Sequence, residues 1–272
     1  MSHQSYYEDN HAYAEFLARQ PSRSYAKYVE ALTLPRGARV LDVGCGVGTV
    51  VNALQQASVE AYGVDVSRPN IARAQRTCSR CQLYDGTHLP FPSGFFDAVG
   101  AMYVLEHVEE PEAFISELVR VARPGGKIVL SSPNFFRALG WSDYHPQMRG
   151  LVQKWANARR LCAKRRQIRT APDTVRFDRL TPIRRWPLQP DDDAIVATNA
   201  LEMKFFLERN GCDVETLSCC DRPVARPLEF LLDLGPWRYA LFNAFVIARR
   251  CKGSSLPIGA LHRGASRIGA TP

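Results

Sequence analysis

Three glycines at alternate positions, Gly44, Gly46 and Gly48, stand between the apolar run Val40–Val43 and an apolar-rich stretch that reaches Leu54. Glycine lets the backbone turn sharply, and it lets a ligand approach main-chain atoms that a Cβ would shield. The stretch that follows is expected to be a helix, whose first N–H groups have no partner within the helix and point back at the loop. The pattern therefore predicts a strand, a glycine loop and a helix that together bind a nucleotide.

Two further observations narrow the kind of nucleotide. The spacing is G-x-G-x-G, which differs from the G-x-G-x-x-G of dinucleotide-binding loops. Asp65 ends a second short strand, expected at 60–65, which follows the glycine loop and its helix. An acid about 20 residues after such a loop binds ribose hydroxyls in βαβ nucleotide sites, and Asp65 lies close to that position. The spacing therefore argues against the dinucleotide class, and Asp65 is expected to bind ribose hydroxyls.

The elements that must position these residues follow one another regularly. Strands are expected at 40–43, 60–65, 81–85, 96–103 and 127–132, and helices between them include one at 111–122. This alternation predicts a doubly wound parallel α/β sheet, whose ligands bind beyond the carboxyl ends of the strands. The glycine loop, Asp65, Asp85–Gly86 and Met102–Tyr103 all follow strands at that edge and are expected to converge on a single crevice.

Together, these motifs resemble the class I S-adenosylmethionine-dependent methyltransferases of the small-molecule type. Val40-Leu-Asp-Val-Gly-Cys-Gly-Val-Gly48 resembles the first motif of that family, and Gly63-Val-Asp65 its second. Asp85–Asp97, Val104–Val108 and Arg123–Lys127 match its later motifs. The resemblance implies two more strands, expected at 212–217 and 242–248, and hence a Rossmann-like, seven-stranded, mostly parallel sheet with the last strand antiparallel. It also implies S-adenosylmethionine as the cofactor.

The resemblance assigns cofactor-binding roles position by position. The loop residues Gly44, Cys45, Gly46 and Gly48 would hold the methionine part, with Asp42 near its amino group. Asp65, followed by Val66, would bind both ribose hydroxyls. Asp85 would accept a hydrogen bond from the adenine amino group while the Gly86 backbone lies against the ring, and Met102 or Tyr103 would border the sulfonium.

Tyr103 and His107 are the candidate catalytic residues. Quinone O-methyltransferases and RNA-end 2′-O-methyltransferases among the relatives carry Glu-x-x-Glu-His here and use it with a divalent metal, whereas this chain has Tyr103-Val-Leu-Glu106-His107. Since a hard cation needs several oxygen ligands and one of the two carboxylates is missing, no metal site is predicted. His107 is a candidate general base because imidazole titrates near neutral pH. The alternative is that Glu106 and His107 only hold the start of the next helix beneath the cofactor.

A single methyltransferase domain is expected over residues 1–252. Residues 1–37 are predicted to form amphipathic helices that either cover an edge of the core or act as a lid over the site. Residues 135–197 are predicted to form a helical insertion that roofs the crevice after the fifth strand. Phe135, Phe136, Trp141, Tyr144 and His145 would line an apolar pocket there or anchor the insertion to the sheet. Residues 253–272 are predicted to be a flexible tail.

The basic residues are concentrated in the insertion. Of a formal net charge of +8, residues 149–185 carry 12 Lys and Arg against two acids. This segment is either a solvated helix face or a docking surface for an anionic or carrier-linked substrate, or for membrane headgroups. Trp155, Phe177 and Trp186 lie among the basic residues, as stacking sites for RNA bases would. The Asn/Asp-Pro-Pro-aromatic tetrad of base methyltransferases is absent, so nucleic acid is the less favoured partner.

The expected function is transfer of a methyl group from S-adenosylmethionine to a small molecule or biosynthetic intermediate, at oxygen. The alternatives are an RNA methyltransferase that uses residues 149–185, and a non-catalytic module that binds the cofactor. No secretory signal and no apolar run of about 20 residues is visible, and the eight cysteines suit reduced thiols, so a cytoplasmic location is expected. The oligomeric state is not predicted.

Overall fold

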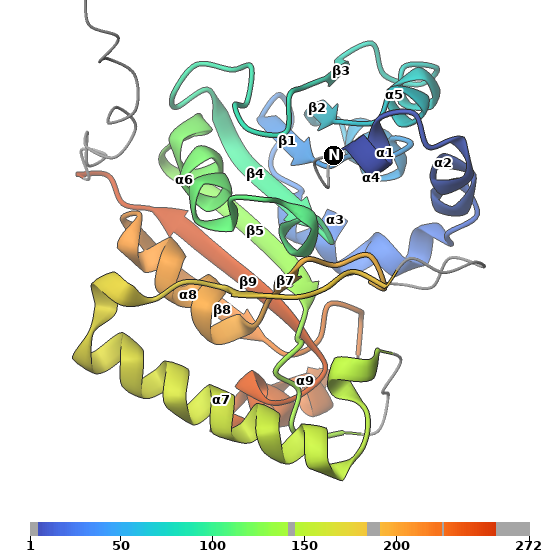
Figure 1. Cartoon of the computed structure of the whole chain (residues 1–272). Coiled ribbons are helices and arrows are strands. Elements are labelled where there is room, and N and C mark those ends of the chain that lie inside the picture. The colour runs from blue at the N-terminus through green and yellow to red at the C-terminus, as the bar shows by residue number, and fades with distance from the viewer. Residues whose placement is uncertain (1–4, 141–144, 184–190, 225, 254–272) are drawn as a thin grey trace, which may run out of the picture.

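A seven-stranded sheet forms the centre of the molecule in the computed structural model, which describes residues 5–140, 145–183, 191–224 and 226–253 (Figure 1). The strand order is β3-β2-β1-β4-β5-β9-β8. Only β9 is antiparallel to its neighbours β5 and β8, as the sequence predicts. The strands are β1 (Arg39–Val43), β2 (Glu60–Asp65), β3 (Cys81–Leu83), β4 (Phe96–Met102), β5 (Ala122–Pro133), β8 (Cys212–Ser218) and β9 (Asn243–Arg250). Trp141, Tyr144, Trp186 and residues 254–272 lie outside the described residues.

Alternating apolar side chains divide the core into two layers, because successive residues of a strand face opposite sides of a sheet. In β1, Val40 packs toward α3 (Ala26–Leu32), α4 (Thr49–Gln56) and α5 (Arg68–Ala74). Leu41 and Val43 pack toward α6 (Pro111–Val121) and α8 (Ala200–Arg209), which lie in front of the sheet in Figure 1. Helices on both faces make this the doubly wound sheet that the sequence predicts, with its ligand edge at the carboxyl ends of the parallel strands.

Residues 5–25 form three short helical elements. They are α1 (Ser5–Glu8), α2 (His11–Ala18) and the 3-10 helix η1 (Ser22–Tyr25). The Asn10 side chain accepts a hydrogen bond from the Tyr13 amide and so caps α2, while Pro21 precedes η1. The Glu15 carboxylate lies 2.6 Å from the Arg73 guanidinium, and this contact holds α2 against α5. The segment therefore lies beside the ligand edge of the sheet.

Residues 124–126, expected to separate a helix from the fifth strand, belong to the strand itself. Strand β5 begins at Ala122, which pairs with Phe96, and pairing resumes at Lys127 opposite Ala98. The intervening residues form an irregularity in the register, where Gly125 has a φ of +78°. The glycine pair is thus a bulge within a continuous strand.

The insertion after β5 carries a small core of its own. Its elements are the 3-10 helices η3 (Pro146–Met148) and η4 (Pro172–Thr174), helix α7 (Leu151–Thr170), and a two-stranded sheet of β6 (Asp178–Arg179) and β7 (Val196–Ala197). Phe135 and Phe136 are fully buried against Met148 and Ala197. The prediction that these two phenylalanines line the substrate pocket is wrong, because they fill the space beneath the insertion and anchor it to the sheet.

Lys164 departs from the prediction of a solvated basic face on α7. Its ammonium lies 2.7 Å from the buried Glu202 carboxylate and 2.8 Å from that of Asp178. Between β8 and β9 the described residues form α9 (Arg226–Asp233) and the 3-10 helix η5 (Pro236–Tyr239). Among the helices of the described residues, none has the length and apolar character needed to cross a bilayer.

Candidate active site

A cavity of about 1490 Å³ opens at the carboxyl ends of the parallel strands. It is bordered by both the cofactor loop and the candidate catalytic residues. The predicted site residues that line it are Asp42, Gly44, Cys45, Gly46, Asp65, Val66, Gly86, Met102, Tyr103 and His107. Gly48 and Asp85 are not among the lining residues. The structure therefore brings most of the predicted site together in one cavity.

The backbone conformation and close contacts of the glycine loop disfavour any residue with a Cβ at its three glycines. Gly44, Gly46 and Gly48 all have positive φ, which L residues rarely adopt. A Cβ on Gly44 would lie 2.2 Å from a Val104 methyl, and one on Gly48 would lie 3.0 Å from Ala74. Gly48 does not line this cavity; it is the N-cap of α4, where it turns the chain into the helix. The loop is thus a bare main-chain cradle.

The Asp65 carboxylate accepts hydrogen bonds from the main chain that hold this loop in place. One carboxylate oxygen accepts a hydrogen bond from the Gly46 amide at 2.9 Å, and the other accepts from the Ser67 amide at 2.8 Å. Burial raises the pKa of Asp65, while these amides and the Asn70 side chain oppose that rise by favouring the charged form. Asp65 therefore positions the loop in addition to facing the cavity.

Asn70 is a site residue that the sequence analysis missed. Its amide nitrogen donates to the Asp65 carboxylate at 3.2 Å. Its side-chain oxygen is buried at the cavity wall and has no hydrogen-bond partner in the described residues. A buried polar atom without a partner is costly, so this oxygen suits a ligand hydroxyl. Its signal in the sequence is its place in the first turn of α5, shortly after Asp65.

Asp42 faces the cavity from the end of β1 and is held by the N-terminal segment. The Tyr28 hydroxyl donates to its carboxylate at 2.8 Å. This approach requires Gly100, since a Cβ there would lie 2.3 Å from the Tyr28 oxygen. Burial raises the pKa of Asp42 to about 7, and the Tyr28 hydrogen bond opposes the rise. A carboxyl of this kind changes charge near neutral pH.

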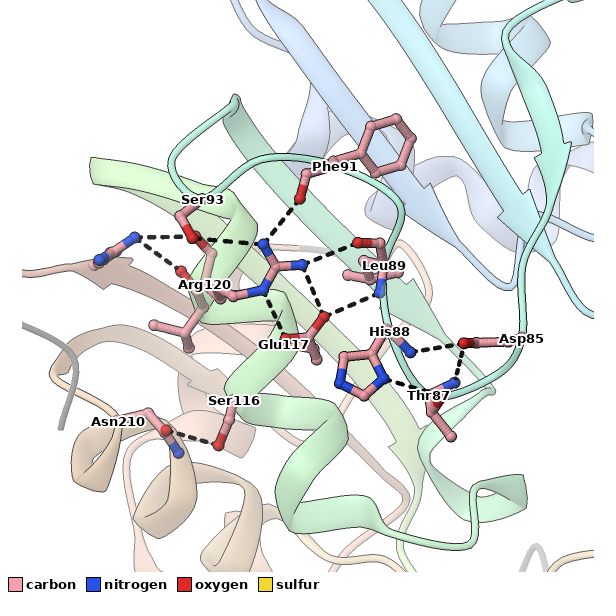
Figure 2. A network of polar contacts seen from close by, with 12 residues as sticks. Asp85, Thr87, His88, Leu89, Phe91, Ser93, Ser116, Glu117, Arg120 and Asn210 are labelled. Atoms are coloured by element: carbon pink, nitrogen blue, oxygen red, sulfur yellow. Dashed lines mark hydrogen bonds and ion pairs between the residues drawn. The ribbon is translucent and has the colours of Figure 1, made fainter. Parts of the chain in front are cut away.

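The loop that carries Asp85 and Gly86 is braced from α6 (Figure 2). The exposed Asp85 carboxylate accepts hydrogen bonds from the Thr87 and His88 amides at 2.8 and 2.7 Å and so closes a turn. Further along, the Arg120 guanidinium donates to the carbonyls of Leu89 at 2.9 Å and Phe91 at 2.8 Å. The Glu117 carboxylate, which pairs with Arg120, accepts from the Leu89 amide at 3.0 Å. This brace was not predicted.

Tyr103 follows β4 in the left-handed region, with a φ of +58°. Such a conformation is strained for a residue with a large side chain, and surrounding contacts must hold it. The Tyr103 hydroxyl donates to Asp221, whose carboxylate also accepts from the Asn243 side chain at 2.8 Å. Contacts from two distant segments thus fix the ring of Tyr103 at the cavity wall.

His107 is held by Tyr7 from α1 and by Asp193 from the end of the insertion. The Tyr7 hydroxyl donates its proton to Asp193 at 2.6 Å and lies 3.0 Å from His107 Nδ1. Burial raises the pKa of Tyr7 far above its usual value, and the Asp193 charge adds to the rise. Because the hydroxyl has a single proton and donates it to Asp193, the Tyr7 oxygen is left to accept from Nδ1–H of His107. The contact between Tyr7 and Asp193 was not predicted, because the two residues are 186 positions apart in the sequence.

The site suits a nucleoside rather than a dinucleotide. The bare main-chain cradle, the carboxylate of Asp65 and the unpartnered oxygen of Asn70 together provide acceptors for a vicinal diol beside a close-approach loop. The order of the seven strands and this site define the Rossmann-like class of S-adenosylmethionine-dependent methyltransferases. A family model described as a methyltransferase domain matches residues 13–216, and the chain belongs to this family.

Individual relatives agree on the class and differ in what they methylate. The chain is 31% identical to a ubiquinone biosynthesis O-methyltransferase of Methylococcus capsulatus, over 40% of this chain and 48% of that protein. It is 36% identical to a phosphatidylethanolamine N-methyltransferase of Cereibacter sphaeroides, over 42% of this chain and 58% of that protein. The matches thus span about half the length of these relatives.

Solved structures resemble the chain over more of its length. A crystal structure of an S-adenosylmethionine-dependent methyltransferase from Aquifex aeolicus matches 89% of this chain and 99% of its own, with a TM-score of 0.53 and 16% identity. A likeness at this identity confirms the fold.

The hypothesis that Phe177 stacks on RNA bases is not supported, because Phe177 is buried and stacks on Phe206.

Proposed function

We propose that the protein transfers a methyl group from S-adenosylmethionine to a small-molecule acceptor, at oxygen. The observation that carries this proposal is the convergence of the glycine cradle, Asp65 and the unpartnered oxygen of Asn70 on one wall of the 1490 Å³ cavity. When bound there, S-adenosylmethionine supplies an electrophilic methyl group on a charged sulfonium. The loop from Gly44 to Gly48 would hold the methionine part, and Asp65 and Asn70 the ribose hydroxyls.

The other end of the cavity is assigned to the acceptor. Methyl transfer to a hydroxyl requires that the oxygen be held in line and that its proton be removed. Tyr103 and His107 border the cavity next to Met102. The Tyr103 hydroxyl donates to Asp221, and its oxygen accepts a long hydrogen bond of 3.3 Å from Asn243; we propose that the acceptor hydroxyl replaces Asn243 as the donor to this oxygen. His107, with Nδ1 directed at Tyr7, acts on the acceptor through Nε2.

The N-terminal segment is proposed to be a lid. Tyr7, Tyr13 and Leu17 line the cavity from α1 and α2, and the contact of Arg73 with Glu15 holds α2 in place. A closed lid would exclude water from the reacting centre and favour transfer to the bound acceptor.

The cofactor assignment is tested by replacing Asp65 with alanine. This variant loses the ribose acceptor and also the hydrogen bond that positions the Gly46 amide, so we expect binding of S-adenosylmethionine to be undetectable by isothermal titration calorimetry. Asp97→Ala, which removes a carboxylate at the opposite end of β4, is the control and should bind as the wild type does. Unchanged affinity in Asp65→Ala would refute the assignment.

The acceptor is sought with isotope-labelled methyl groups. Purified protein, labelled S-adenosylmethionine and a cell extract are incubated, and labelled products are separated and identified by mass spectrometry. Label on a small molecule with loss of a free hydroxyl group supports the proposal. Label on RNA, or cofactor binding without any labelled product, would instead support one of the two alternative functions.

A further inference from the structure

Three ligand-type side chains meet behind the acceptor end of the cavity. Donor atoms of Glu106, His107 and Asp191 all lie within 4.8 Å of one another. Glu106 and His107 belong to the 3-10 helix η2 (Leu105–His107) after β4, and Asp191 comes from the insertion. Ligand bonds to divalent cations are about 2.0 to 2.4 Å long, so two atoms that bind one ion lie up to about 4 to 5 Å apart. The spacing of the three donors is therefore that of a metal site.

Glu106 has a carboxylate oxygen for which the described part of the protein provides no hydrogen bond. The residue is fully buried, and its Oε2 accepts from the Ser132 hydroxyl at 2.7 Å. Its Oε1 has no hydrogen-bond partner among these residues and lies 3.9 Å from His107 Nε2. A buried carboxylate oxygen in this condition is costly unless a cation compensates it.

The Tyr7 and Asp193 contacts fix which ring nitrogen of His107 can bind a ligand. Because the Tyr7 proton goes to Asp193, His107 Nδ1 carries the proton that reaches the Tyr7 oxygen. In the neutral ring, Nε2 then has the lone pair, and it is Nε2 that lies toward Glu106 Oε1. A chain of this kind, from a carboxylate through a hydroxyl to the far nitrogen, is how metal-binding histidines are oriented.

Asp191 is directed to this place by the local backbone. It has a φ of +59°, a conformation that non-glycine residues seldom adopt. The Ala194 amide donates to its carbonyl at 3.1 Å, and the next residue, Ile195, donates to the carbonyl of Glu106 at 2.9 Å. The end of the insertion is thus joined to η2 by the main chain. This contact explains how a carboxylate reaches η2 from a distant part of the sequence, where Tyr103 supplies none.

We propose that Glu106, His107 Nε2 and Asp191 bind one divalent cation of the manganese or magnesium class. Two carboxylate oxygens and one imidazole suit such an ion, and three protein ligands leave positions for water or an acceptor oxygen. The site borders the cavity through His107. Its role at the acceptor end rests on the proposed function: with the ion bound, His107 Nε2 would be a ligand in place of acting as a base, and the cation would stabilise the acceptor oxygen as its proton passes to water. Binding of the cation itself does not depend on methyl transfer.

The test uses Mn²⁺, whose free ion is measured by electron paramagnetic resonance. The full chain is treated with chelator, desalted and titrated with MnCl₂. We expect the wild type to bind one Mn²⁺, and Glu106→Gln and Asp191→Asn to bind it about tenfold more weakly or worse. Asp173→Asn is the matched control, since this aspartate of the insertion is exposed and paired with Arg209. It should bind Mn²⁺ as the wild type does.

Circular dichroism and calorimetry with S-adenosylmethionine establish that each variant is folded. If Glu106→Gln does not fold, Asp191→Asn decides the result, because Asp191 is only partly buried. No bound Mn²⁺ in the folded wild type overturns the proposal, as does binding of equal strength in wild type, Glu106→Gln and Asp191→Asn. The measurement uses no methyl acceptor, so it separates failure of the metal site from failure of the proposed function.

Discussion

At the scale of single residues, the charge of Asp42, beside the glycine loop, changes with pH near neutrality. Its pKa of about 7, raised by burial from an ordinary value of 3.8, means that much of the carboxyl is protonated in the empty site at neutral pH. The protonated form of Asp42 adds to the free energy of unfolding. This contribution is fully present below pH 3.8, the ordinary pKa, and is lost as the pH rises to about 7, the pKa in the folded protein. For the proposed binding of S-adenosylmethionine the sign is reversed, because only the ionised form of Asp42 would attract the ammonium group of the methionine part.

We therefore expect the affinity for S-adenosylmethionine to rise as pH increases through neutrality. One unit below its pKa only about a tenth of the carboxyl is ionised, so binding should weaken about tenfold there. Calorimetry across this pH interval measures the effect. In Asp42→Asn the affinity should be lower, and most of its pH dependence should disappear. A slope equal to that of the wild type would assign the dependence to another group, such as Asp65.

Residues whose roles depend on local sequence could be predicted, and residues that act across the fold could not. Gly44, Gly46 and Asp65 follow strands at fixed short distances, so their types and spacing were sufficient to place them at the cavity. Tyr7 and Asp191 reach His107 and Glu106 only because the N-terminal segment and the insertion fold back onto the same strand end. Their chemical role depends on partners in distant parts of the chain, which one sequence does not reveal.

At the scale of elements, the Arg120 brace connects α6 to the loop that carries Asp85 and Gly86. Removing it should loosen this loop, because the carbonyls of Leu89 and Phe91 would lose charged donors. Hydrogen bonds from charged groups are worth about 1.5 to 3 kcal/mol each, and part of that loss falls on cofactor binding. We expect Arg120→Met to weaken binding of S-adenosylmethionine by about tenfold.

Hydrogen exchange and calorimetry check this expectation together. Amides of residues 85–93 should exchange faster in Arg120→Met than in the wild type. The control is Arg123→Met, which removes an arginine of the same region whose ion pair is with Asp97 on β4. If both variants bind S-adenosylmethionine equally, the brace has no part in shaping the adenine end of the site.

The spacing of apolar residues predicted the strands and helices of the sheet domain well, but it did not predict which core each buried side chain joins. The strand and helix pattern of residues 38–134 agrees with β1 to β5 and with α6, since each apolar position faces one of the two layers. The same apolar character in Phe135 and Phe136 does not say which cavity the rings fill. The insertion supplies a third core for them, and only its tertiary packing against Met148 shows this.

At the scale of the whole molecule, helix α7 is joined to the sheet domain by buried polar contacts as well as by apolar ones. The Asn157 side chain donates to the carbonyls of Phe135, Arg137 and Gln147 at 2.8 to 3.1 Å. Near the other end of α7, Lys164 reaches the fully buried carboxylate of Glu202 on α8. These two contacts fix the direction of a helix whose other basic residues are mostly exposed.

Breaking the Lys164–Glu202 contact should destabilise the fold far more than the loss of an exposed lysine would. Lys164→Met leaves the buried Glu202 carboxylate without its cation, and removing one partner of a buried pair costs about 3 to 5 kcal/mol. Urea denaturation followed by circular dichroism measures this loss. Arg165→Met, the next and exposed position of the same helix, should change stability by no more than about 0.5 kcal/mol. Equal losses in both variants would mean that the Lys164–Glu202 pair contributes no special stability. Rescue of Lys164→Met by the second substitution Glu202→Gln would show that the uncompensated carboxylate causes the loss.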